Sequence, residues 1–457
     1  MENGCIYCGC SSDLSKSDIV PDALTNAKII NPFVCHIEHN SKFSDMFENE
    51  VISKLALITN ELDIKSSKGK TYAAYEANFL IGDTEYKTKI TSETNLFMND
   101  KKMRSVDEKS LLGPIEDIRK IKGSEDTSII EVDVNQIEIE KRVSIDLNVY
   151  FSNEMFRLAA KIAFEWYCLK NNVKTKRNEF SPVIEFITTG EGANIVSFIN
   201  TKEVYDIFKK MASFGSHVLL SYTAIDNSVN VIVDLFGIAM YNVRLSDKTI
   251  DGCNSNVLFQ ELTLDAKHID FADTNIEEFQ LNTMNCFESK IIGLGMQAMI
   301  PKDMTDITLG YKLNYISYYE MFQTKLELLV EPTKEAVSLL LNNIQDILQE
   351  SAVTIRGLKR FVKEHQKHFD TGLKLNPNGT NKKSIFMFYM LFLIGKSNGA
   401  IKNLHDLNEI LKYKFSDSTI DINDELTKKL NEELLGAEEN MELIVKGAKD
   451  INAWKYE

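Results

Sequence analysis

Apolar residues recur at helical spacing along several stretches of the chain. The clearest stripe covers 153–170 and predicts a helix there. The same spacing predicts helices over 45–62, with Ser44 as the N-cap, and over 202–211. Beyond residue 301 the pattern returns repeatedly, which predicts a mainly helical region. Its expected helices cover 315–330, 332–349, 355–369, 384–394, 405–413 and 422–435.

Alternation of apolar and polar residues predicts strands in the middle of the chain. One group lies between 72 and 150, with a turn at Gly82-Asp83, and its strands cover 77–81, 86–91, 129–134 and 143–150. Further along, 217–224 and 229–236 predict a hairpin, followed by a third strand over 238–245. Two short segments, 183–187 and 195–199, fit either strands or helical turns, and 250–300 shows no clear pattern.

These patterns predict an α+β protein in three parts. A small N-terminal module with its closing helix covers 1–63, a mixed α/β domain covers 72–300, and a mainly helical domain covers 301–457. The longest apolar run, Ile385 to Ile394, has ten residues, against about 20 for a membrane span. No secretory signal is recognisable at the N-terminus, so we expect a cytoplasmic protein without membrane contact.

The charge of the chain argues against non-specific nucleic-acid binding. Its formal net charge is -15, and residues 1–60 contain four lysines against eight acidic residues. The exception is the predicted helix 355–369, where Arg356, Lys359, Arg360, Lys363 and Lys367 oppose Glu364. This helix fits either a solvated surface or a contact with a phosphate backbone.

The candidate chemistry lies in the first forty residues. Cys5-x2-Cys8 is followed by Cys35-x3-His39, and two such pairs around a short loop-rich stretch are typical of a tetrahedral zinc site. Four protein ligands close the coordination sphere, which predicts a structural ion that stabilises a module with little core. The alternative is a set of unligated thiols, and Cys10 and His36 are spare ligand candidates.

Residues 5–47 resemble the HNH endonuclease-like proteins of bacteria and their phages. The resemblance rests on Cys5-Ile6-Tyr7-Cys8, on Ile19-Val20-Pro21, on Asn31 and on Asn40 after the last zinc ligand. It implies a zinc-stabilised ββα module and hydrolysis of phosphodiesters with Mg²⁺ or Mn²⁺, plausible in defence against phage. The catalytic candidates that it implies are Asp18, Asn31 and Asn40.

Two positions depart from the family pattern. The second ligand pair is Cys35-x3-His39 in place of CxxC, and Ser17-Asp18 stands where the family has Asp/Glu-His. The family's histidine activates water as a general base, whereas an ionised aspartate, with an ordinary pKa of about 4, is a weak base. Asp18 therefore has three readings: a ligand for a hard cation, a remnant in a dead nuclease, or a turn cap.

Two functions follow as hypotheses. The chain is either a metal-dependent endonuclease of the HNH type or a catalytically degenerate zinc module that binds nucleic acid or protein as a scaffold or sensor. A protein partner or a second copy of the chain would bind through the C-terminal helical region. His217 opens an apolar strand and is interpreted as a structural histidine.

Overall fold

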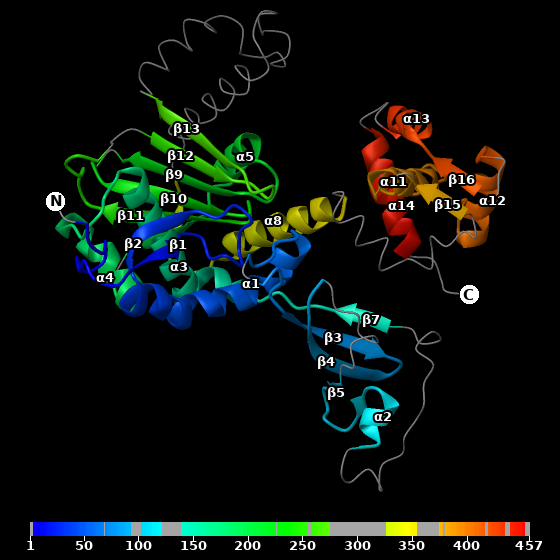
Figure 1. Cartoon of the computed structure of the whole chain (residues 1–457), viewed down its shortest axis with the longest axis horizontal. Helices are drawn as coiled ribbons and strands as arrows, with labels where there is room; N and C mark the ends of the chain where they lie inside the picture. Colours follow the sequence, from blue (N-terminus) through cyan, green and yellow to red (C-terminus); the bar gives the residue numbers. More distant parts are fainter. Residues whose placement is uncertain are drawn as a thin grey trace, which may run out of the picture. The chain divides into compact units, whose positions relative to one another are not determined.

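The structure is a computed structural model, and its elements are shown in Figure 1. The chain divides into two compact units, Met1–Ile347 and Leu348–Glu457. The expected boundary near residue 300 lies outside the described residues, so the domains 1–63, 72–300 and 301–457 stay predictions. The structure describes residues 3–67, 69–92, 102–120, 139–192, 194–224, 226–253, 257–274, 326–353, 374–377, 380–415, 419–434 and 439–452.

The N-terminal part contains two antiparallel strands and a helical segment. Strand β1 (Leu14–Asp18) pairs with β2 (Ile30–Cys35), and the chain then turns helical through η1 (His36–Ser41), η2 (Ser44–Glu48) and α1 (Asn49–Glu61). The helix predicted over 45–62 is therefore present, but Ser44 as its N-cap is wrong. Helical structure already starts after Cys35, and the Ser44 hydroxyl bonds Asn40 and Glu48 within the helix.

A five-stranded antiparallel sheet follows, with the order β6-β5-β4-β3-β7. The predicted hairpin around Gly82 is confirmed, while the strand predicted over 143–150 is wrong. A short 3-10 helix, η4 (Leu147–Phe151), stands there because the Asp146 carboxylate accepts a hydrogen bond from the amide of Asn148 and caps it. The predicted strand 129–134 lies outside the described residues. The elements are β3 (Tyr75–Ile81), β4 (Thr84–Ile90), β5 (Met103–Ser105), β6 (Leu111–Leu112), α2 (Ile115–Ile118) and β7 (Ile139–Arg142).

Helix α3 (Asn153–Lys170) is the core of the first unit, and the sequence predicts it correctly. All side chains from 155 to 168 are buried. It packs on a seven-stranded antiparallel sheet with the order β13-β12-β9-β10-β11-β8-β14. Figure 1 labels β13, β12, β9, β10 and β11 of this sheet. The Trp166 indole donates to Gln260 of this sheet at 2.7 Å. The strands are β8 (Val196–Ile199), β9 (His217–Thr223), β10 (Val229–Leu235), β11 (Ala239–Ser246), β12 (Val257–Leu262), β13 (His268–Thr274) and β14 (Leu328–Leu329).

The predicted hairpin β9–β10, the third strand β11 and the helix over 202–211 are confirmed. Of the two ambiguous segments, 183–187 is helical and 195–199 is a strand. The helix predicted over 315–330 is wrong at its C-terminal end, where Leu328 and Leu329 form β14 and pair with β8. Residues 315–325 of this prediction lie outside the described residues. The remaining elements of the region are η5 (Asn178–Phe180), α4 (Ser181–Thr189), α5 (Lys202–Met211) and α8 (Lys334–Val353).

The second unit is mainly helical, as predicted, around one short parallel strand pair. Strands β15 (Lys374–Pro377) and β16 (Thr419–Ile422) lie among four helices: α11 (Thr380–Lys396), α12 (Leu404–Phe415), α13 (Asp424–Leu434) and α14 (Glu439–Asn452). The helix predicted over 355–369 falls outside the described part of the chain, and α14 is not predicted. The fold class is α+β. In the described residues no helix has both the length and the apolar character that crossing a membrane requires.

Candidate metal centre

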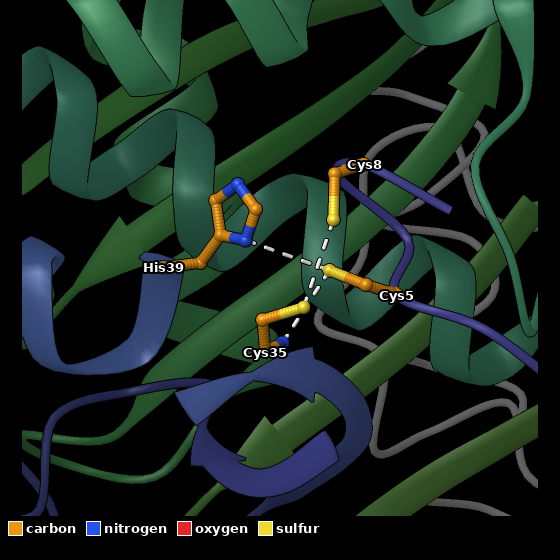
Figure 2. A group of neighbouring side chains, drawn as sticks. All are labelled: Cys5, Cys8, Cys35 and His39. Atoms are coloured by element: carbon orange, nitrogen blue, oxygen red, sulfur yellow. Dashed lines mark hydrogen bonds between the residues drawn. The ribbon is translucent and has the colours of Figure 1, made fainter. Parts of the chain in front are cut away.

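Cys5, Cys8, Cys35 and His39 lie together in the N-terminal part of the first unit (Figure 2). The first two come from the turn before β1, Cys35 ends β2, and His39 lies in η1. One ligand atom from each residue lies within 4.8 Å of every other. The Cys5 sulfur is 3.6 Å from His39 Nδ1, and the Cys8 and Cys35 sulfurs are also 3.6 Å apart. These four residues could hold a metal ion.

The two 3.6 Å distances, from Cys5 to His39 and from Cys8 to Cys35, fit a tetrahedral site. Zinc–ligand distances of about 2.0–2.3 Å place tetrahedral ligands about 3.3–3.8 Å apart. Burial raises the pKa of the Cys5 and Cys35 thiols and lowers the pKa of His39. The imidazole is thereby kept neutral, as a ligand must be, while buried thiolates need a cation to offset their charge.

The local backbone explains why these residues converge. Gly9 has a φ of +81°, which a residue without a Cβ adopts readily, and its amide donates to the Cys5 carbonyl at 2.7 Å. The amides of Tyr7 and Cys35 both point at the Cys5 sulfur, at 3.4 Å. Cys10 and His36 are not part of the ligand group, and the Cys10 sulfur bonds Ser12 at 2.9 Å.

Asp18 stands at the end of β1, and its carboxylate is already paired. The Lys28 ammonium lies 3.0 Å from it, and the Asp18 side chain is only 22% exposed. Among the described residues, no second group of three or more His, Cys, Asp or Glu side chains forms around Asp18. Asp22, the nearest acidic residue in the sequence, is held by Ser66 and Ser67.

Asn31 and Asn40 both donate hydrogen bonds to other segments of the first unit. The fully buried Asn31 amide donates to the Glu165 carbonyl, and its oxygen accepts from the Phe33 amide, both at 2.9 Å. Asn40 donates to the Ser15 hydroxyl and the Lys16 carbonyl, at 3.2 and 3.3 Å. In the described part of the chain the three catalytic candidates thus contact different partners, and their place in a reaction stays a prediction.

Sequence reasoning missed a buried charge cluster beside these residues. Lys161 of α3 lies 3.0 Å from Glu48 and 3.8 Å from Glu165, and it also donates to the carbonyls of Asp18 and Ile19. The signal was available, because Arg157, Lys161 and Glu165 occur every four residues and share one face of an otherwise apolar helix.

The cluster carries one cation and two carboxylates away from solvent. Burial raises the pKa of Glu165 to about 7, although Lys161 acts in the opposite direction. For Lys161, burial acts to lower the pKa, but the two carboxylates outweigh it and raise the pKa above its ordinary value. Removing one member of such a cluster leaves the other charges buried without a partner, which is strongly destabilising. We therefore expect the cluster to hold α3 and the N-terminal part together.

No protein-family model matches the chain, and comparison with curated proteins and with solved structures found no match.

Proposed function

We propose that residues 3–62 form a zinc-stabilised module of the HNH type that lacks a working catalytic set and acts as a platform for binding a protein partner. The observation that carries the proposal is the state of Asp18 and Asn31. The first is ion-paired with Lys28, and the second is buried and bonded to the backbone of α3. Neither side chain is free to activate water.

Zinc is the metal that this ligand set favours. Three cysteines and one histidine are a common structural zinc set, and soft thiolates disfavour Mg²⁺ and Ca²⁺. With four protein ligands, no coordination position remains for a substrate or a water. A zinc ion here would therefore stabilise the module without taking part in a reaction.

Charge supports a protein partner over nucleic acid. Residues 1–60 carry a net charge of -4, from four lysines and eight acidic residues. Non-specific nucleic-acid binding relies on neutralising phosphates with cations, which this module does not offer in excess.

A nicking assay tests the proposal against the endonuclease alternative. Supercoiled plasmid is incubated with Mg²⁺ or Mn²⁺ and with the wild type, Asp18→Ala or Asn40→Ala. We expect no cleavage by any of them, while elemental analysis finds one zinc per chain. Cleavage by the wild type that Asp18→Ala abolishes would overturn the proposal.

The alternative keeps one specific observation in its favour. Asp18 is the last residue of β1, and Asn40 donates a hydrogen bond to Ser15 of the same strand. Both side chains are partly exposed, so a hard cation could approach them. An active enzyme would hydrolyse phosphodiesters with Mg²⁺ or Mn²⁺, plausibly in bacterial defence against phage. Under that alternative, cleavage requires the cation and disappears on chelation.

A further inference from the structure

Tyr7 joins the candidate metal centre to the core of the first unit. It lies between the ligands Cys5 and Cys8, and its ring stacks on the His39 ring, with centroids 5.0 Å apart and planes 20° apart. Its amide donates to the Cys5 sulfur. A movement of Tyr7 would thus disturb two of the four ligands at once.

The hydroxyl of Tyr7 is anchored on α3. It donates to Oε1 of Glu165 at 2.9 Å, and both side chains are buried. The Phe164 ring, also on α3, packs edge-on against the Tyr7 ring, with centroids 5.1 Å apart. Tyr7 thus donates to one oxygen of this carboxylate, while the other oxygen, Oε2, lies 3.8 Å from the Lys161 ammonium.

Lys161 fixes Glu165 from the other side. It is 1% exposed and reaches Glu48 of η2 as well as the backbone carbonyls of Asp18 and Ile19. The same lysine therefore contacts the helical segment that carries His39, through Glu48, and the β1–β2 hairpin at the end opposite to Cys35. One turn of α3 organises all the segments that supply the four ligands.

We infer that Glu165 and Lys161 are positioning residues for the metal centre, acting through Tyr7, and that loss of the metal is coupled to loosening of α3 from the N-terminal part. The inference rests on the proposed zinc site. Removing a group that orients a metal ligand typically lowers the metal affinity about 10–100-fold. The coupling is reciprocal: if the bound metal stabilises the contact between α3 and the N-terminal part, then that contact raises the metal affinity by the same factor.

The first experiment measures zinc loss. Tyr7→Phe removes the hydroxyl that bonds Glu165 and retains the ring on His39. The matched control is Tyr222→Phe, which removes a tyrosine hydroxyl bonded to Asn242 at 2.8 Å in the sheet. Zinc transfer to a coloured chelator is followed after mixing. We expect transfer about tenfold faster for Tyr7→Phe and unchanged for Tyr222→Phe.

A second pair of variants separates positioning from general stability. Glu165→Gln keeps an oxygen that accepts from the Tyr7 hydroxyl but removes the charge that faces Lys161, so we expect it to retain zinc better than Glu165→Leu. Glu165→Leu should release zinc as fast as Tyr7→Phe. Equal zinc loss in Tyr7→Phe and Tyr222→Phe, at equal melting temperatures, would overturn the inference.

The second readout reports on α3 itself. The chain has two tryptophans, and Trp454→Phe leaves Trp166, next to Glu165, as the single reporter. We expect chelation of zinc to shift the Trp166 emission to longer wavelength. If the wild type binds zinc fully and chelation leaves the Trp166 emission unchanged, the coupling to α3 is contradicted, whereas the proposed zinc site is not. Absence of zinc from the wild type contradicts the proposed function itself, and the inference with it.

Discussion

At the residue scale, Asn31 and the four candidate metal ligands differ in where their partners lie along the chain. The four ligand candidates fall in two short pairs, and the structure brings them within 4.8 Å of one another. The partner of the Asn31 amide could not be found in this way. Asn31 bonds the backbone at Glu165, which lies on a helix predicted only as an apolar stripe. Side-chain roles that depend on such distant contacts need the tertiary structure.

His217 shows how a buried titratable residue limits stability. Its Nε2 donates to the Leu24 carbonyl at 2.8 Å, and its ring packs on Phe236. Burial lowers the pKa of His217 from 6.5 to about 4. Between these values the unfolded chain binds a proton that the native state excludes, so stability falls as pH drops from about 6.5 to about 4.

The expected cost is about 2 kcal/mol at pH 5 relative to pH 7, from 1.36 kcal/mol per pKa unit. Urea unfolding of the wild type and His217→Gln at both pH values measures it. The difference in unfolding free energy between the two proteins should shrink at pH 5, because glutamine does not titrate. A constant difference across this range would show that His217 is protonated in the native state as well.

At the element scale, periodicity predicts long elements and fails at short or irregular ones. Helix α3 and the hairpin β9–β10 have the predicted positions, because each is long and rich in apolar residues and is buried along most of its length. The error at 143–150 arose because apolar and polar residues alternate from Val143 to Val149, although the second half of the segment lies in a 3-10 helix in which Val149 and Tyr150 are buried in succession. Strands β12 and β13 stand in a stretch where the sequence showed no clear pattern.

Helices α11 and α14 make a close crossing that depends on two glycines. A Cβ at Gly395 would overlap the Leu443 carbonyl, and one at Gly447 would overlap the Leu391 carbonyl. Gly447→Ala should therefore destabilise the second unit by about 1–3 kcal/mol, as overpacking does. Helix propensity alone predicts the opposite sign, a gain of about 1 kcal/mol.

Chemical denaturation of the full chain, followed by circular dichroism, distinguishes the two signs. Glu442→Ala is the matched control, since it lies on the same helix and is exposed. We expect that variant to unfold within about 0.5 kcal/mol of the wild type. A Gly447→Ala protein as stable as the control would mean that the helices cross at a greater distance.

At the scale of the whole molecule, the chain behaves as two units with separate cores. The second unit has its own apolar cluster around Phe386, Tyr389 and Leu391 of α11. All four candidate ligands belong to the first unit, and the buried cluster of Lys161, Glu48 and Glu165 connects them to α3. The sequence predicted a helical C-terminal region and shows the spacing of Lys161 and Glu165 on α3, but it does not show that Glu48 of the N-terminal part pairs with them.

This division predicts that metal removal acts on one unit only. Because a metal that binds the native state stabilises it by its binding free energy, chelation should lower the melting temperature of the first unit by about 10 °C. The second unit should melt unchanged, since none of its described residues belongs to the ligand group. Differential scanning calorimetry with and without EDTA measures both transitions.

Cys8→Ser should reproduce the shift, whereas Cys10→Ser, whose sulfur lies outside the ligand group, should not. Equal shifts in both transitions would mean that the two units unfold together.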